Sequence, residues 1–457
     1  MDAYDQIDSR PVTGHQRSVI ALMVTSNIAE FFDMFLIGFV VSVLTTAWRL
    51  TGFEAGAILA CSGLGTVIGA IAWGHLADRF GRKRAHTWCI VCFVGFTVVS
   101  VFLPDRAWLA LALLRVGVGV GVGGMNITSI PYVQEFVPAR HRGLLSGLVS
   151  VFIPVGMLLG AAAQGLVGDD WRALMAFGAI PALLLVWLHM VPESPRYLQA
   201  RGDVEGARRA LAWAMEIPVA QVGELLETGA SREAGGRPSA APGDASWRRG
   251  EFARVFAHHA RSLAIVSVGT FCFVLGGFAV QSWGQTLLKD AFGFPVRMVG
   301  LLFVGVSVAD VLGRLASAWL ADVIGRRVTL FVFGAVGAAG CFVAAFAHGS
   351  GWVFYAAVVV IMAFGDGVFG ILNAFGGEQF PNDVRSTALG LGYGIGATAK
   401  VVGPAFMGLL VGGGYVAQRI DIAVVTTAFS FFGACMLVGA VVYLFAAETR
   451  GRRLESL

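Results

Sequence analysis

The chain of 457 residues alternates long apolar runs with short polar segments. A helix needs about 20 mostly apolar residues to cross the hydrocarbon core of a bilayer, and twelve runs approach or exceed that length. They cover residues 19–46, 54–74, 86–104, 107–132, 143–166, 171–191, 262–288, 297–320, 327–347, 352–376, 387–411 and 421–446. This pattern predicts an all-α integral membrane protein with twelve transmembrane helices.

One long polar stretch, residues 192–260, separates the runs into two sets of six. Its middle part is rich in Gly, Ala, Pro, Ser and Arg, a composition typical of a linker. We therefore expect an N-terminal six-helix bundle over 1–191, a cytoplasmic central loop over 192–260, and a C-terminal six-helix bundle with a short cytoplasmic tail over 261–457. Most Lys and Arg residues lie in the termini, the central loop and alternate loops, which places both termini in the cytoplasm.

Composition agrees with a chain embedded in lipid. Hydrophobic residues make up 56% and charged residues 14%, whereas ordinary soluble domains carry about 25% charged residues. The net charge of +4 is too small to indicate a nucleic-acid partner. The sequence has no phosphate loop, no metal-ligand cluster and no nucleophile–base arrangement, so we expect neither an enzyme nor a bound metal or cofactor.

Two loop sequences recur in both halves. The loop after the second run reads Gly-His-Leu-Ala-Asp-Arg-Phe-Gly-Arg-Lys from Gly74, and the loop after the eighth reads Ala-Trp-Leu-Ala-Asp-Val-Ile-Gly-Arg-Arg from Ala318. A Glu–Pro–Arg spacing follows both the fourth and the tenth run. Two signatures that recur at nearly one period indicate a duplication, and six intervening spans put both copies on the same membrane side. The halves are therefore predicted to be parallel repeats.

These loops are candidates for a cytoplasmic gate, because ion pairs between helix ends can hold one conformation and break in another. Simple anchoring of the loops by Arg and Lys is the alternative. Charged residues after the sixth and twelfth runs, and an i,i+4 pair in the eighth, complete the candidate set. Its members are Gly74, Asp78, Arg79, Gly81, Arg82, Glu135, Arg142, Glu193, Arg196, Asp310, Arg314, Asp322, Gly325, Arg326, Glu378, Arg385 and Glu448.

Polar residues inside the apolar runs are unevenly distributed. Ionisable groups at bilayer depth are costly and are functional candidates by default. The polar residues inside the runs, charged or neutral, concentrate in runs 1, 4, 7 and 10, and Lys400 lies in run 11. Candidates for the substrate cavity are Asn27, Asn126, Gln281, Trp283, Gln285, Asp366, Asn373 and Lys400, and candidates for proton coupling are Asp33, Arg115 and Glu30.

Depth along the spans suggests how these charges pair. Asp33 and Arg115 lie at depths that a long Arg side chain can bridge. A nearby guanidinium favours the charged carboxylate and dehydration favours the protonated one, so the pair could bind and release a proton; a static ion pair is the alternative. Glu30 shares the face of Asp33, either as a second titrating group or as the partner of a loop arginine. Asp366 is expected to pair with Lys400, unless Lys400 receives an anionic substrate.

The loop that starts at Gly74 resembles the signature of the major facilitator superfamily. Pro-Glu-Ser-Pro-Arg from 192 and Glu-Thr-Arg-Gly-Arg from 448 resemble sugar-porter signatures, and Asn-Ile-Ala-Glu-Phe-Phe-Asp from 27 is similar to a motif of metabolite:proton symporters. The resemblance implies two six-helix repeats around a central cavity lined by helices 1, 4, 7 and 10. It also implies that Asp33 and Arg115 match the acid and the arginine of proton-coupled sugar porters.

We therefore expect a monomeric secondary active transporter in the cell membrane, a bacterial inner membrane by the resemblance. Its partners would be protons, the lipid bilayer and a small polar metabolite, an organic acid or related compound, carried by alternating access. Three alternatives stay open. A proton-linked antiporter that exports small molecules would fit less well, since run 5 lacks a Gly-Pro pair. A sugar transporter or facilitator would carry Gly-Pro-x-x-Trp in run 10, and this chain lacks that motif. A membrane nutrient sensor would need longer terminal tails to hold a signalling domain.

Overall fold

The computed structural model describes residues 3–138, 152–225, 255–347, 350–380, 385–420 and 422–449. Within these ranges the regular secondary structure is almost entirely helical, and Thr51 and Tyr415 form an isolated antiparallel bridge. Eleven helical segments there are long and apolar enough to cross a membrane, and Ile153–Val167 is a shorter apolar helix. The expected all-α membrane fold with twelve spans is confirmed.

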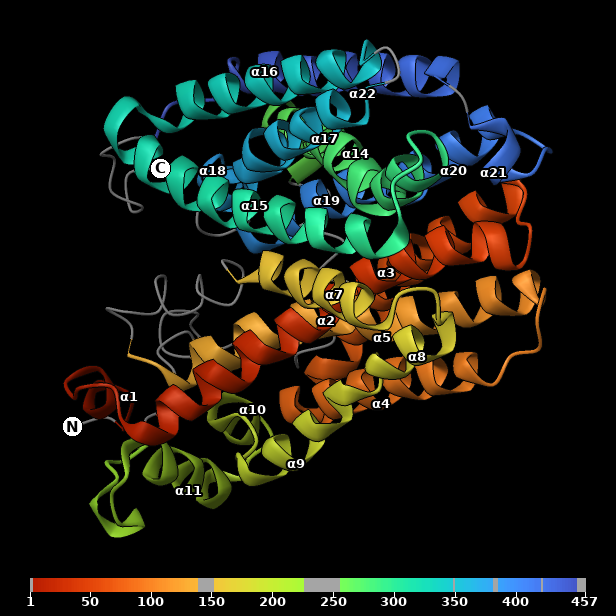
Figure 1. The fold of residues 1–457 in the computed structure, drawn as a ribbon. Coiled ribbons are helices and arrows are strands. Elements are labelled where there is room, and N and C mark those ends of the chain that lie inside the picture. The colour runs from red at the N-terminus through yellow and green to blue at the C-terminus, as the bar shows by residue number, and fades with distance from the viewer. Residues whose placement is uncertain are drawn as a thin grey trace.

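The first six spans form an N-terminal bundle, coloured red to yellow in the lower part of Figure 1. Its spanning helices are α2 (Gly14–Ala47), α3 (Gly52–Phe80), α4 (Arg82–Val101), α5 (Trp108–Phe136), α7 (Ile153–Val167), and a sixth span made of α8 (Trp171–Phe177), η2 (Ile180–Ala182) and α9 (Leu183–Met190). Short helices α1 (Ala3–Asp8), α10 (Pro195–Ala200) and α11 (Val204–Met215) lie at one end of this bundle.

The last six spans form a C-terminal bundle, coloured green to blue above the first (Figure 1). It contains α14 (Ala260–Asp290), α15 (Val296–Ile324), α16 (Arg326–Ala345), a tenth span of α17 (Gly351–Val360), η4 (Ile361–Asp366), η5 (Gly367–Gly370) and α18 (Leu372–Glu378), an eleventh span of α19 (Arg385–Ala397) and α20 (Ala399–Val411), and α22 (Ile422–Tyr443). The short helix α21 (Val416–Arg419) precedes α22.

Three spans are less regular than the apolar runs predict. The sixth breaks at a 3₁₀ turn that contains Pro181, because proline has no N–H to donate and its ring disturbs an α-helix. The tenth passes through a π-helical segment and a 3₁₀ turn between Ile361 and Gly370. The eleventh is interrupted at Thr398. Hydrophobicity alone predicts continuous helices here, since it carries no information on local backbone pitch.

Local sequence explains where several spans begin and end. Thr13 and Gln16 form a capping box at the start of α2, with Thr13 N 2.9 Å from Gln16 Oε1 and Gln16 N 3.2 Å from Thr13 Oγ1. Such reciprocal bonds satisfy amides that a helix start leaves free. At the C-terminal end of α3, Gly81 has φ +104°, a conformation that glycine adopts without a Cβ penalty. This glycine allows the sharp turn into α4.

Among the described residues, the two bundles contact one another mainly where α2 packs against α14, α7 against α15, and α3 against α20. Glycines permit the close crossings, because a Cβ on Gly56 would lie 2.8 Å from Gly408 Cα. Near the same ends of the helices, Lys289 Nζ lies 2.6 Å from Ser42 O and 2.6 Å from Thr46 Oγ1. These contacts close the end of the molecule opposite to α1.

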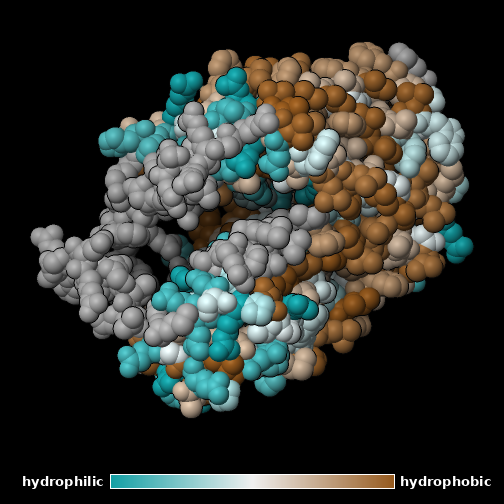
Figure 2. Space-filling model, turned by 90° about the vertical axis from the view of Figure 1, so that its left-hand side faces the viewer, coloured by the Kyte–Doolittle hydropathy of each residue, from teal (hydrophilic) through white to brown (hydrophobic). Residues whose placement is uncertain are grey.

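The surface matches a protein embedded in lipid. Figure 2 shows apolar side chains over a broad area of one face, with hydrophilic ones gathered at one side of it. Large apolar side chains such as Leu166 and Leu183 are more than 70% exposed, which would be costly in water and is expected where a helix faces hydrocarbon. The same view shows a hollow between the upper and lower bundles.

Candidate transport site

Asp33 and Arg115 meet in the interior of the N-terminal bundle. Arg115 Nη2 lies 2.7 Å from Asp33 Oδ2 and Nη1 lies 3.2 Å from Oδ1, a bidentate geometry that gives strong, directional charge-assisted hydrogen bonds. Arg115 Nε also donates to Ser62 Oγ at 3.0 Å, and Thr97 Oγ1 donates to Asp33 Oδ1 at 3.4 Å. This cluster joins α2, α3, α4 and α5. Sequence reasoning missed Ser62 and Thr97, because single hydroxyls in apolar runs carry no distinguishing signal.

A second charged group sits where the bundles meet. Lys400 of α20 is buried, with Nζ 4.0 Å from Met34 Sδ of α2. Its ammonium lies 5.6 Å and 5.8 Å from the ring centres of Phe31 and Phe278, one from each bundle. Its charge also acts on Glu30, which is buried and whose Oε2 has no hydrogen-bond partner in the described ranges. Among the residues that the structure describes, Lys400 makes no ion pair within 4.0 Å.

The expected pairing of Asp366 with Lys400 is wrong. Asp366 Oδ1 accepts a hydrogen bond from Gln281 Nε2 at 3.1 Å, and Oδ2 pairs with the guanidinium of Arg314. The π-helical segment Ile361–Asp366 ends at this acid, and α15 lies against that segment. Lys400 instead faces α2. Asp366 and Lys400 lie at similar depths in two neighbouring spans, but similar depth does not ensure contact, because the two side chains can point toward different helices.

Asp310 and Arg314 are also placed differently from the expectation of a gate near the repeated loop. Both lie at the middle of α15, buried, with Arg314 Nε 3.0 Å from Asp310 Oδ1. They belong to a cluster with Asp366 inside the C-terminal bundle. The i,i+4 pairing itself is as the sequence spacing suggests.

Other cavity candidates divide into buried and exposed residues. Asn27, Trp283 and Gln285 are buried on α2 and α14, and Asn27 Oδ1, Trp283 Nε1 and Gln285 Oε1 have no hydrogen-bond partner among the described residues. Asn373 is exposed on α18 and is not part of this group. The side chain of Asn126 lies outside what the structure describes.

Two further buried polar side chains were missed by sequence reasoning. Gln164 of α7 is fully buried, and within the part of the chain that the structure describes neither its amide nitrogen nor its amide oxygen has a hydrogen-bond partner. Thr286 of α14 is in the same situation. Buried polar groups without partners are rare and costly, so spans 1, 5 and 7 carry hydrogen-bonding capacity that a polar ligand can use. An amide inside an apolar run was the available signal for Gln164.

The first repeated loop is held by a carboxylate from after the sixth span. Glu193 accepts hydrogen bonds from the backbone N–H groups of Lys83 at 2.9 Å and Arg84 at 3.3 Å, at the positive N-terminal end of α4. Arg82 Nε lies 3.4 Å from Glu135 Oε1, and Ser194 Oγ donates to Glu135. The gate candidates Arg82, Glu135 and Glu193 therefore come together.

The second repeated loop has the same arrangement. Gly325 has φ +100°, and Glu448 accepts from the backbone N–H groups of Arg326 at 3.2 Å and Arg327 at 3.1 Å. Arg326 pairs with Glu378, which also accepts from Thr449 Oγ1 at 2.5 Å. The repeat thus includes Glu193 and Glu448 as equivalent residues, although the unequal spacing along the chain conceals this.

The remaining gate candidates lie around these clusters. The guanidinium of Arg196 lies 5.2 Å from the ring centre of Tyr4, Gly74 is half-buried and Asp322 is exposed. Arg142 and the side chains of Asp78 and Arg385 lie outside the described residues.

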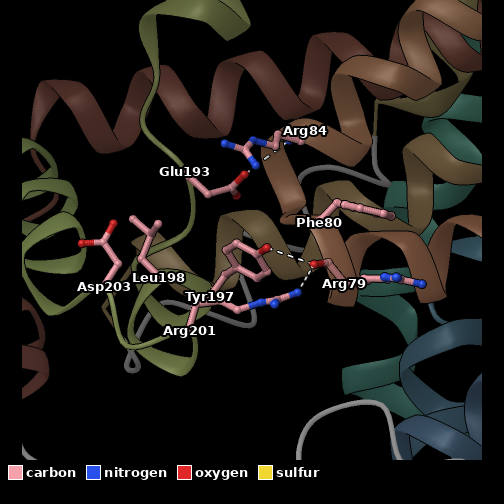
Figure 3. Close-up of a pocket in the computed structure, with 8 residues that line it drawn as sticks. All are labelled: Arg79, Phe80, Arg84, Glu193, Tyr197, Leu198, Arg201 and Asp203. Atoms are coloured by element: carbon pink, nitrogen blue, oxygen red, sulfur yellow. Dashed lines mark hydrogen bonds between the residues drawn. The ribbon is translucent and has the colours of Figure 1, made fainter.

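A pocket of about 450 Å³ opens beside the first loop cluster. Figure 3 shows Tyr197 and Arg201 of the α10 region pointing toward the backbone of Arg79, with Arg84 near Glu193. Tyr197 Oη donates to Arg79 O at 3.0 Å. The pocket is lined by the end of α3, the start of α4 and segments after the sixth span, so it is separate from the buried charges between the bundles.

Comparison with known proteins decides the family. A family model described as "Sugar (and other) transporter" matches residues 19–457. The chain belongs to this family of the major facilitator superfamily. It is therefore a multi-pass membrane transporter, and its twelve-helix fold is the fold of that superfamily.

Similar proteins cover almost the whole chain. The niacin transporter NiaP of Acinetobacter baylyi is 26% identical over all of both chains. The 4-hydroxybenzoate transporter PcaK of Pseudomonas putida is 24% identical over 97% of this chain and 95% of its own. Among solved structures, a D-xylose-proton symporter superposes with a TM-score of 0.73 at 20% identity, covering 95% of this chain and 99% of that one. This last likeness concerns the fold.

Proposed function

We propose that the protein is a proton-coupled symporter that imports a small organic acid across a bacterial inner membrane by alternating access. The observation that carries the proposal is Lys400, a buried ammonium between the two bundles that has aromatic rings beside it and no carboxylate partner among the described residues. A buried charge without a partner is costly, and a carboxylate ligand would remove that cost.

The surroundings of Lys400 suit an aromatic carboxylate. Rings of Phe31 and Phe278 offer flat apolar surface for stacking, and the free polar atoms of Asn27 and Gln285 offer hydrogen bonds. Two similar proteins are named for 4-hydroxybenzoate and cis,cis-muconate, which are carboxylates. These names support the same substrate class for this chain.

Glu30 can couple the binding of an organic acid to the uptake of a proton. Its carboxylate and an anionic substrate would compete for the charge of Lys400, and two negative groups at one buried cation repel each other. Protonation of Glu30 removes this repulsion. Substrate binding therefore favours proton uptake at the same site, and release of one favours release of the other.

Asp33 and Arg115 form the second part of the coupling. The bidentate pair ties Asp33 of α2 to Arg115 of α5 in this arrangement. Protonation would weaken the pair and free α2 to move relative to α5. A conformational step that reverses this change would release the proton on the other side.

The contacts between the bundles suggest the state of the transporter. They close the end opposite to α1, so with both termini in the cytoplasm the cavity opens inward. In this proposal residues 1–191 and 261–457 form the two halves of a monomer that rock against each other, and 192–260 form the cytoplasmic loop. The clusters around Glu193 and Glu448 act as cytoplasmic gate elements.

The test is uptake of 4-hydroxybenzoate by proteoliposomes with an imposed inward proton gradient. We expect accumulation that a protonophore abolishes, alkalinisation of the external medium on substrate addition, and loss of uptake in Lys400→Met. Arg172→Met, which removes an exposed basic side chain that pairs with Asp105, should retain proton-driven uptake. Proton-driven uptake of xylose that is indifferent to Lys400→Met would overturn the organic-acid proposal, and substrate-driven acidification of the external medium would indicate an antiporter instead.

A further inference from the structure

The C-terminal bundle contains a buried acid cluster that the proposed coupling does not use. Arg314 Nε lies 3.0 Å from Asp310 Oδ1, and its Nη2 pairs with Asp366 Oδ2. Asp310 is 0% and Asp366 3% exposed. Gln281 Nε2 donates to Asp366 Oδ1 at 3.1 Å. The cluster links α15, the π-helical segment η4 and α14.

The charges of this cluster do not balance. Two carboxyl groups share one guanidinium, so full ionisation leaves one negative charge buried, which is costly without a further partner. Asp310 Oδ2 has no hydrogen-bond donor among the described residues. Asp310 and Asp366 both contact the guanidinium of Arg314, so their carboxyl groups converge on one cation. A single proton placed between them would satisfy Asp310 Oδ2 and restore neutrality.

Neighbouring helices bring no other charge to the cluster. Among the described residues, the groups that act on Asp310 are Arg314 and Asp366, and those that act on Arg314 are the two acids. Mid-span titratable residues on the packed elements are Cys272 on α14, Cys341 on α16 and Tyr355 on α17, whereas Lys289, Asp290, Arg326, Arg327 and Glu378 lie near helix ends. The spanning part of α7 between Ile153 and Val167 carries no titratable residue.

The backbone is built to bring the acids together. Asp366 is the last residue of the π-helical segment Ile361–Asp366, and π-helical insertions often mark functional sites because the wider turn changes where side chains point. Gly313 allows α15 to approach the carbonyl of Ala363, where a Cβ would collide. On the other side, a Cβ on Gly277 would lie 2.6 Å from Asp366 Oδ1.

We propose that Asp310 and Asp366 share one proton and form a second proton-binding site, in the C-terminal half of the transporter. This site goes beyond the proposed coupling at Glu30 and Asp33, and it does not require that the substrate be an organic acid. Carboxyl groups that share a site take up a proton as a pair, so the proton belongs to the pair rather than to either residue.

Gln281 connects the pair to the contact between the bundles. It lies on α14 where a Cβ on Gly38 of α2 would be 3.0 Å from Gln281 O. Movement of α2 against α14 would therefore disturb the hydrogen bond from Gln281 to Asp366. Gln281 therefore links the arrangement of the two bundles to the hydrogen bonding of the carboxyl pair.

Infrared spectroscopy of the purified protein in lipid, across a pH titration and without substrate, tests the site. A protonated carboxylic acid has a carbonyl stretch that is separate from that of a carboxylate. The measurement is made in a Glu30→Gln background, which removes the other buried carboxyl group proposed to take up a proton. We expect such a band there at neutral pH, its loss when Asp310→Asn is added, and its retention when Asp33→Asn is added. Asp290→Asn, at the other end of α14 and paired with Lys289, is the matched control and should leave the band unchanged.

A second variant keeps the test decisive if Asp310→Asn does not fold. Asp310→Glu retains an acid at this position and should shift the band rather than remove it. A spectrum at neutral pH that Asp310→Asn and Asp310→Glu both leave unchanged would overturn the shared proton. Because the measurement uses no substrate, failure of organic-acid uptake and failure of this site are distinguishable.

Discussion

Arg115 of α5 holds Asp33 of α2 by two hydrogen bonds, of 2.7 Å and 3.2 Å, in the buried interior of the N-terminal bundle. Both side chains are no more than 1% exposed. A bidentate pair of this kind adds geometric specificity to its energy. The charge of one carboxyl group is therefore tied directly to the contact between two spanning helices.

Replacement of that acid should uncouple transport from the proton gradient. Asp33→Asn retains the shape of the side chain but cannot bind or release a proton. We expect accumulation of 4-hydroxybenzoate against its gradient to be lost, whereas counterflow exchange continues in the same proteoliposomes. Asp105→Asn, which breaks an exposed pair with Arg172 worth about 0–1 kcal/mol, should behave as wild type. Wild-type accumulation by Asp33→Asn would contradict the role of this acid.

Glu30 should govern the pH dependence of substrate affinity. At alkaline pH an ionised Glu30 repels an anionic substrate from Lys400, so the KM of the wild type should rise with pH. Glu30→Gln removes the titrating group, and the rise should become flatter. KM for 4-hydroxybenzoate, measured from acidic to alkaline pH, is the readout. The idea fails if both proteins show the same pH profile.

The glycine before α4 should be intolerant of a side chain. Gly81→Ala requires φ +104° of a non-glycine residue and places a Cβ against the carboxylate of Glu193. The positive φ alone costs about 1–2 kcal/mol, and the collision disturbs the loop cluster. We expect a lower unfolding temperature and reduced uptake. Gly202 also has a positive φ, but a Cβ there would meet nothing within 4 Å. Gly202→Ala therefore introduces backbone strain without a collision, and it should affect uptake little. Equal uptake by the two variants would argue against a role for the cluster.

The close crossing of α3 and α20 should control the closed end of the molecule. A Cβ on Gly56 would lie 2.8 Å from Gly408 Cα, and Gly56→Val adds two further methyl groups there. We expect the two helix ends to separate. Spin labels at positions 49 and 415, which lie in contact across this end, would report a longer distance in a background without native cysteines. Gly95→Val has open space around its Cβ and should leave the distance unchanged; an unchanged distance in Gly56→Val would refute the prediction.

Sequence reasoning succeeded where the signal was local or repeated. The twelve spans follow from the length of apolar runs, with differences of a few residues at most described ends. The Glu–Pro–Arg spacing and the glycine turns indicated the loop clusters, because helix N-termini and charged partners need those residue types. Sequence reasoning gave the wrong partner for Asp366, because depth in the membrane alone suggested Lys400. It also missed Ser62, Thr97 and Gln164, because a neutral polar residue in a span gives the same sequence signal whether or not it lies at a site.

The sequence by itself determined a twelve-span membrane transporter of two parallel repeats and identified the charges that remain inside the membrane. These properties follow from hydrophobicity, charge placement and recurring motifs, which can be read from the order of residues along the chain. Only the tertiary structure decided which of those charges meet. An α-helix has about 3.6 residues per turn, so a local change of pitch changes the neighbour that a side chain faces. The π-helical segment at 361–366 directs Asp366 to Arg314, whereas α20 places Lys400 against α2.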